Sequence, residues 1–112
     1  MDWEIEQTLV CPVTGTGFAI ASAVKNMKLI LWYKGNYFLR TGNILSHSPF
    51  GVIVNGRRTS IAIIHTFHYS SALWQTFKNR ISCPGNDDPG IIVCPRYKAC
   101  IFTLCPYGAK SD

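Results

Sequence analysis

Carboxylates are missing from most of this sequence. Only six of its 112 residues are acidic, and none of them lies between Glu6 and Asp87. A pair of carboxylates for general acid–base catalysis is therefore nearly excluded from the central part of the chain. That interval carries a formal charge of +8, against +5 for the whole chain, from eight basic residues: Lys25, Lys28, Lys34, Arg40, Arg57, Arg58, Lys78 and Arg80. Such a charge attracts polyanions, although scattered basic residues can also serve solubility alone.

Long apolar runs and a leader-like N-terminus are missing as well. The run from residue 18 to residue 24 contains a serine and is far shorter than the ~20 residues that span a bilayer. The first residues, MDWEIEQ, carry acids where a signal peptide carries bases. We therefore expect an intracellular protein, of unknown compartment, with no membrane span. The length predicts a single compact domain, 1–112, and the low charged fraction of 15% predicts a surface partly covered in a homo-oligomer or a larger complex.

The five cysteines lack the C-x-x-C spacing that usually presents thiolates to zinc. Four of them precede a proline, which is typical of strand ends and is also similar to the Cys-Pro motifs of haem-regulated proteins. We expect no cofactor, and zinc is the alternative, with these candidate ligands: Cys83, Cys94, Cys100 and Cys105. Because the count is odd, at least one thiol stays free or pairs between chains. On a strand, His65 and His68 would face opposite sides and would not share a metal.

A thiol enzyme would need a nucleophile and a base. Cys11 precedes a segment expected to be helical, and His47 lies just before the strand-like FGVIVNG. This order resembles that of the NlpC/P60 papain-like hydrolases, although Val10 stands where that family has an aspartate. The resemblance implies that Cys11 is the nucleophile and His47 the base. We keep this hydrolase as an alternative, and we lean toward a protein that is not an enzyme.

The first half of the chain predicts strands and one short helix. Residues 3–10 alternate apolar and polar side chains, as a half-buried strand does. The alanine-rich segment 18–26 favours a short helix over a strand. Residues 28–33 and 37–40 are expected to pair as a hairpin that turns at 34–36. Residues 44–50 are expected to be a connector.

The strongest local signal lies in the stretch 51–68. Asn55-Gly56 separates two β-branched runs, 52–54 and 61–64, and this dipeptide favours a tight hairpin turn. Arg57 and Arg58 follow at once, so the hairpin is expected to present two guanidinium groups at its tip.

The last part of the chain predicts one helix, a loop and two strands. Ser70-Ser71 can cap a helix over 71–81, with one buried face formed by Leu73, Trp74, Phe77 and Ile81. Residues 83–90 form a loop, and 91–94 and 99–105 are expected to be strands. The fold class is therefore α+β, mainly β, with a curled or barrel-like antiparallel sheet of hairpins. One amphipathic helix (about 71–81) and a short second helix (about 18–26) complete it.

Basic and aromatic residues alternate in a way that favours binding of an acidic partner. Aromatic faces stack on bases, and basic side chains follow phosphates. The candidate anion or nucleic-acid contacts are Arg57, Arg58, Lys34, Arg40, Trp32, Tyr33 and Tyr37, with Phe38 as a further aromatic. We expect a non-catalytic binding or assembly module whose partner is RNA, single-stranded DNA or an acidic protein surface. A structural subunit of a larger assembly is the first alternative.

Overall fold

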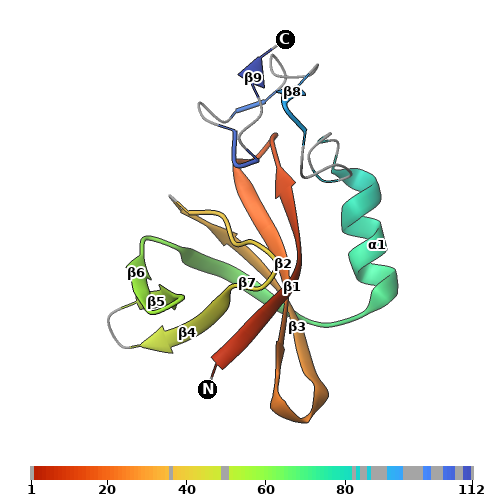
Figure 1. The fold of residues 1–112 in the computed structure, drawn as a ribbon. Helices are drawn as coiled ribbons and strands as arrows, with labels where there is room; N and C mark the ends of the chain where they lie inside the picture. Colours follow the sequence, from red (N-terminus) through yellow and green to blue (C-terminus); the bar gives the residue numbers. More distant parts are fainter. Residues whose placement is uncertain are drawn as a thin grey trace.

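The computed structural model describes residues 2–35, 37–48, 51–81, 83, 86, 91–94, 100–101, 105–107 and 110–111. Figure 1 shows a β-rich fold with one α-helix beside a curled sheet. The elements in chain order are β1 (Asp2–Cys11), β2 (Thr16–Ala23), the 3-10 turn η1 (Val24–Asn26), β3 (Met27–Lys34), β4 (Ile44–Ser48), β5 (Gly51–Val54), β6 (Arg57–Thr59), β7 (Ala62–His68), α1 (Ser71–Arg80), β8 (Val93–Cys94) and β9 (Lys110–Ser111).

Seven strands form one antiparallel sheet in the order β6-β5-β4-β1-β2-β3-β7. The sheet curls into a half-barrel, with β5 and β6 on one side and α1 on the other (Figure 1). Its two edge strands, β6 and β7, are joined by only two residues, Ser60 and Ile61. The expected fold class, a curled antiparallel sheet with one helix, is confirmed.

The expected short helix over 18–26 is wrong, because this segment is mostly the central strand β2. It pairs with β1 on one side and with β3 on the other. Ala19 and Ala21 are completely buried, and their small side chains fit the crowded concave face of the sheet. Two ladders of backbone hydrogen bonds and this burial outweigh the helix propensity of alanine. Only residues 24–26 are helical, as the tight 3-10 turn between β2 and β3.

The predicted strand over 28–33 exists as β3, but the hairpin with 37–40 does not. Residues 37–40 form no strand, and β3 pairs with β2 and β7 instead. Residues 44–50, expected to be a connector, contain the strand β4. Because β4 pairs with both β1 and β5, it is needed to link the two halves of the sheet.

The turn at Asn55-Gly56 is confirmed, although its second arm differs from the expected one. Asn55 and Gly56 have φ angles of 51° and 81°, as a type I′ hairpin turn requires. The arm that follows is β6, which pairs with β5. From Ala62 on, the second apolar run instead begins β7, which pairs with β3 and forms the far edge of the sheet.

The sheet buries both of its faces. Side chains from six strands and the 37–43 loop fill the concave face, around Ile5, Tyr33, Leu45 and Val54. The opposite face packs against α1 through a smaller cluster: Leu9, Phe18, Ile20, Ile30 and Trp74. A β-bulge between Ile5 and Gln7 shifts the alternation of β1, so one strand supplies Ile5 to the first cluster and Leu9 to the second.

Helix α1 agrees with its prediction. The Ser70 hydroxyl accepts a hydrogen bond from the Leu73 N–H (3.3 Å), which makes Ser70 the N-cap. Trp74 is buried, and its ring N–H donates to Gln7 Oε1 (3.2 Å) on β1. Leu73, Phe77 and Ile81 are half-buried against the same face. In the described part of the chain, no helix is long and apolar enough to cross a membrane.

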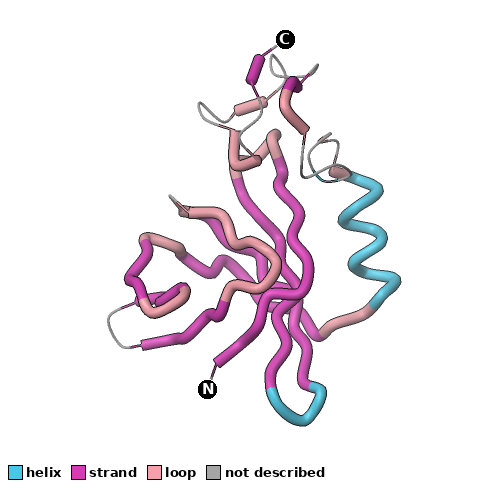
Figure 2. The backbone as a smooth tube through the Cα atoms, viewed as in Figure 1, coloured by secondary structure: helices cyan, strands magenta, loops and turns pink. Residues whose placement is uncertain are grey.

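The C-terminal strand predictions are met only in part (Figure 2). Within 91–94, Val93–Cys94 form β8, which pairs in parallel with β9. Within 99–105, the described residues Cys100, Ile101 and Cys105 are not in a strand, and the others lie outside the described residues.

Candidate functional site

Arg57 and Arg58 lie on β6, at one edge of the sheet, and both are exposed. They are adjacent on a strand, so their side chains leave it on opposite faces and do not form one paired clamp. Arg58 also lines a shallow hollow of about 370 Å³ together with Tyr37, Thr59 and Ser60. The predicted presentation of basic side chains just after a tight turn is therefore present, but the two guanidinium groups diverge.

The loop over 37–43 covers the concave face instead of forming a hairpin arm. Asn43 holds it in place, because its Oδ1 accepts from the Arg40 N–H (2.8 Å) and from the Tyr37 hydroxyl (3.3 Å). The backbone of the loop pairs with β1, through Ile5 N–H to Asn43 O (2.9 Å) and Gly42 N–H to Ile5 O (2.8 Å). The hydrogen bonds of Asn43 explain how a polar side chain is buried here.

The predicted stacking role fails for Tyr33, which is 0% exposed. Its hydroxyl accepts a hydrogen bond from the Leu39 N–H (2.8 Å), and burial raises the pKa of this phenol well above its usual value. Trp32 is half-buried on the opposite face, where it stacks on Phe18 and donates to Thr16 Oγ1 (3.0 Å). Both residues therefore belong to the packing of the sheet.

Tyr37 and Phe38 are half-buried against the concave cluster. Phe38 packs on Tyr33 with ring centroids 5.9 Å apart. Tyr37 lines the Arg58 hollow, and Phe38 lines a second hollow, of about 380 Å³, together with Arg40. Two of the predicted stacking aromatics therefore each line a hollow with an arginine.

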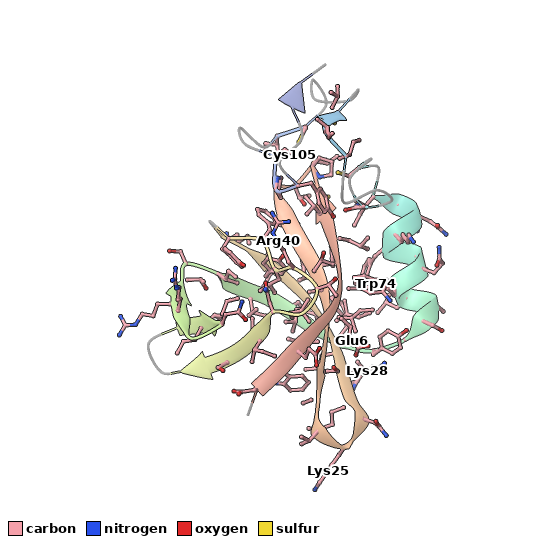
Figure 3. All side chains as sticks on the ribbon, in the orientation of Figure 1. Glu6, Lys25, Lys28, Arg40, Trp74 and Cys105 are labelled. Carbon is pink, nitrogen blue, oxygen red and sulfur yellow. The ribbon has the colours of Figure 1, made fainter. Side chains whose placement is uncertain are left out.

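The basic side chains do not gather on one described hairpin. Lys34 is exposed at the end of β3, and Arg40 lies in the loop, where it donates to the Pro106 carbonyl (2.8 Å). Figure 3 places Lys25 at the far tip of the β2–β3 hairpin and Lys28 beside Glu6. Lys28 Nζ lies 3.4 Å from Glu6 Oε1. Lys78 and Arg80 project from α1, on the other side of the sheet from β6. The described basic side chains are therefore spread over several elements.

The Cys-His pairing of the hydrolase alternative is contradicted. Cys11 ends β1, and a turn and the strand β2 follow it, so no helix N-terminus faces its thiol. β4 pairs with the other end of β1, where Ser46 lies opposite Asp2. The backbone of His47 is therefore more than about 20 Å from Cys11, given a strand rise of about 3.3 Å per residue. Side chains cannot bridge that distance, so the resemblance to NlpC/P60 hydrolases does not extend to the fold.

All five cysteines lie among the described residues, and they are half-buried and not joined in disulfides. Among the residues that the structure describes, no group of three or more His, Cys, Asp or Glu side chains is placed to hold a metal ion. His65 lies opposite Trp32 on the helix face, and His68 lies opposite Leu29 of the concave face. The two histidines therefore face opposite sides of β7, as the spacing of three residues on a strand predicts.

Sequence reasoning missed Asn86 and Tyr107, which tie the C-terminal part to β1. The Asn86 Oδ1 accepts from the Val10 N–H (2.8 Å) and from the Tyr107 hydroxyl (2.5 Å), and its Nδ2 donates to the Val10 carbonyl (3.0 Å). Burial raises the pKa of Tyr107 well above its usual value. Both residues line a hollow of about 380 Å³ with Arg40. No local pattern marks Asn86, because asparagine in a Pro/Gly-rich segment ordinarily predicts a turn.

The edge strand β7 was also missed as a surface feature. It ends the sheet, and five of its seven residues are exposed: Ala62, Ile64, His65, Thr66 and His68. A signal was present in the sequence, because the eleven residues 59–69 contain no charged residue and no proline. Beside its last residue lies an open hollow of about 500 Å³ that Trp3, Met27 and Tyr69 help to line.

Comparisons with known proteins place these features in a family context. The sequence model described as the IraM/PmrD family matches residues 1–75, which span β1 to β7 and the first half of α1. The chain is 55% identical to the anti-adapter protein IraM of Citrobacter koseri, over 99% of this chain and 97% of that protein. It is 31% identical to the anti-adapter protein IraM of Escherichia coli strain K12, over 98% and 100% of the two chains.

A solved structure supports the architecture independently. The crystal structure of E. coli PmrD superposes with a TM-score of 0.62, covering 73% of this chain and 100% of that one. Only 14% of the aligned residues are identical, so this likeness concerns the fold alone.

Proposed function

The chain belongs to the IraM/PmrD family, and we propose that it acts as an anti-adapter, a non-catalytic regulator that binds an adapter protein and blocks its use. The observation that carries this proposal is the 55% identity, over 99% of the chain, to a protein named as an anti-adapter. The separation of Cys11 from His47 supports a role in binding over thiol catalysis.

The charge of the chain supports a finer proposal, that the adapter presents an acidic surface. β5 and β6 contain no carboxylate, and β6 carries Arg57 and Arg58 as exposed side chains. Electrostatic complementarity of this kind chiefly raises the rate of association and its sensitivity to salt. A protein partner replaces the nucleic acid considered from the sequence, for which the family gives no support.

The test begins with the tagged full chain as bait in a lysate of a bacterium that encodes it. A protein that is enriched and identified by mass spectrometry is then purified and titrated against the chain at increasing salt. We expect one-to-one binding to a protein that acts as an adapter in its own assay, and we expect that assay to be inhibited. Tight binding to single-stranded DNA or RNA in fluorescence anisotropy, with no effect on any adapter, would contradict the proposal.

The finer proposal has its own variant. Arg57→Ala/Arg58→Ala should weaken binding about three- to tenfold at low salt and less at high salt, because exposed charge pairs are screened. Lys25→Ala is the matched control, since Lys25 is an exposed cation at the distant β2–β3 tip. Because Lys25→Ala removes one charge and the double variant removes two, a loss of binding free energy half as large from Lys25→Ala would show that only total charge matters.

A further inference from the structure

The seven-stranded sheet is open, and its two edges are unequally protected. β6 is three residues long, and two of them are arginines, which is a common way to prevent unwanted strand pairing. β7 is seven residues long and carries no lysine, arginine, acid or proline. Among the described elements nothing pairs with its outer side, because the sheet order ends there. An unprotected edge of this kind is a template for an added strand.

The register shows which backbone groups face outward. In an antiparallel pair, only alternate residues exchange hydrogen bonds with the neighbouring strand. The Tyr69 N–H donates to the Lys28 carbonyl (3.3 Å), and Phe67 and His65 lie in phase with it, opposite Ile30 and Trp32. The intervening residues, Thr66 and His68, therefore direct their N–H and C=O groups away from β3.

A bulge limits the length of edge that can pair. The register of β7 shifts between Ile63 and His65, so Ile64 is the extra residue there. The regular part of the edge is His65–His68, four residues, which is enough for the short ladders through which extended peptides are captured. Ile64 and Tyr69 flank this part and are 40% and 38% exposed, so each offers an apolar contact at an end of the ladder.

The surroundings of this edge favour an acidic occupant. β3, β7 and α1, the elements that adjoin it in the sheet or follow it in the chain, contain four basic side chains and no carboxylate. Glu6 of β1 is paired with Lys28 of β3 (3.4 Å). Lys34, Lys78 and Arg80 are exposed. A segment carrying carboxylates between apolar residues would gain from this charge as it adds to the strand.

We propose that β7 is the docking edge for the partner protein, whose extended acidic segment adds to His65–His68 as an eighth strand. This inference rests on the proposed function only in that the partner is a protein. Thr66 and His68 supply the backbone hydrogen bonds, and Ile64 and Tyr69 contact apolar side chains of the added segment. The surrounding cations select its charge.

The first experiment needs no identified partner. Amide hydrogen exchange of the full chain is measured alone and with a short peptide of alternating valine and glutamate, and again with lysine in place of glutamate. Without peptide, the amides of Thr66 and His68 should exchange faster than those of His65 and Phe67. The glutamate peptide should slow exchange at Thr66 and His68 by about tenfold or more, as new backbone hydrogen bonds do. The lysine peptide should protect them less.

The second experiment isolates one backbone donor. Thr66→Pro removes an outward N–H, which an edge strand tolerates, and should weaken binding of the glutamate peptide by about tenfold, the effect of one lost hydrogen bond. Thr66→Val, the matched control, keeps the N–H and the side-chain shape, so binding should stay close to wild type. If the proline variant fails to fold, the exchange pattern of the wild-type chain still decides the question.

Three results would overturn the inference. One is unchanged exchange at Thr66 and His68 with saturating glutamate peptide. Another is equal protection by the two peptides. The third is concentration-dependent dimerisation that protects these amides, because the edge would then belong to a second copy of the chain. An adapter that binds and is inhibited without protecting Thr66 and His68 would overturn this docking edge and leave the proposed function intact.

Discussion

Asn86 satisfies both backbone polar groups of Val10 from 76 positions away in the chain. Its amide takes the place of a strand partner near the end of β1, and the Tyr107 hydroxyl donates to the same oxygen. One side chain therefore joins the C-terminal part to the sheet. A tie of this kind depends on the amide group, because no other uncharged side chain of this size offers a donor and an acceptor in that geometry.

Replacing Asn86 should accordingly cost stability. Asn86→Ala removes three hydrogen bonds and leaves partners unpaired, so we expect the free energy of unfolding to fall by about 1–3 kcal/mol in urea denaturation. Asn79→Ala is the matched control, because Asn79 is exposed on α1, where its Oδ1 accepts a hydrogen bond from the Gln75 side chain (3.0 Å). It should change stability by less than about 0.5 kcal/mol. Equal losses from both substitutions would count against the tie.

Tyr33 predicts how stability changes at alkaline pH. Burial raises its pKa in the folded protein above the value of 10.0 of an exposed tyrosine. The folded state therefore keeps its full stability, as far as Tyr33 is concerned, below pH 10.0. As the pH rises from there toward the raised pKa, the free energy of unfolding falls by about 1.4 kcal/mol per pH unit. Denaturation midpoints measured from pH 8 to pH 11, roughly spanning this onset, should fall less steeply in Tyr33→Phe. An unchanged slope in the variant would contradict this role.

Helix α1 shows how a single element is ended and anchored. Two serines, Ser70 and Ser71, lie at its start, and the sequence offers both as caps. In the structure Ser70 has the extended backbone of an N-cap, and its hydroxyl accepts from the Leu73 N–H. Trp74 then anchors the helix, buried among sheet side chains and bonded to Gln7. Lys78 and Arg80 in the last turn complement the helix dipole.

The two serines provide a direct comparison. Ser70→Ala should lower the free energy of unfolding by about 1 kcal/mol through loss of the cap. Ser71→Ala should have almost no effect or stabilise slightly, since alanine is the better residue inside a helix. Thermal and urea unfolding of the two variants would measure the difference. A larger loss of stability from Ser71→Ala would show that Ser71, and not Ser70, caps the helix.

At the scale of the whole molecule, the sheet and α1 contain both apolar clusters. Every residue of these clusters lies between residues 3 and 81. The described residues after Ile81 add contacts to this body from outside, at Val10, Arg40 and Pro12. The concave cluster, the helix-covered face and the exposed edge β7 are thus all formed without the C-terminal part.

Truncation tests this division. A chain ending at Ile81 should keep the circular dichroism of a β-rich fold and unfold cooperatively, because both clusters remain. Its free energy of unfolding should be lower by roughly 2–4 kcal/mol, from the lost ties to Val10, Arg40 and Pro12. Loss of the β signal on truncation would show that the C-terminal part is required for the sheet itself.

Local signals predicted those elements whose determinants lie within a few residues. The Asn55-Gly56 turn needs positive φ at two adjacent residues, and α1 needs a cap and a periodic apolar face. Both were predicted. The helix prediction for the segment 18–26 was wrong because its alanines are buried in a strand that pairs on both sides. The two partner strands lie outside any short stretch of sequence around the segment. The anion site was predicted from residue types. Tyr33 is buried and cannot stack on a ligand, because the alternation of side chains along a strand does not tell which face of the sheet is covered.

The sequence by itself determined the class of the fold, the helix over 71–80, the tight turn before Arg57 and the positive charge of the central region. These follow from side-chain chemistry and spacing along the chain. Only the tertiary structure decided that β3 pairs with β7, that Cys11 and His47 lie far apart, and that β7 is an open edge. Strand pairing is decided by which apolar faces can be buried together, and backbone hydrogen bonds are the same for every partner, so local sequence cannot choose among them.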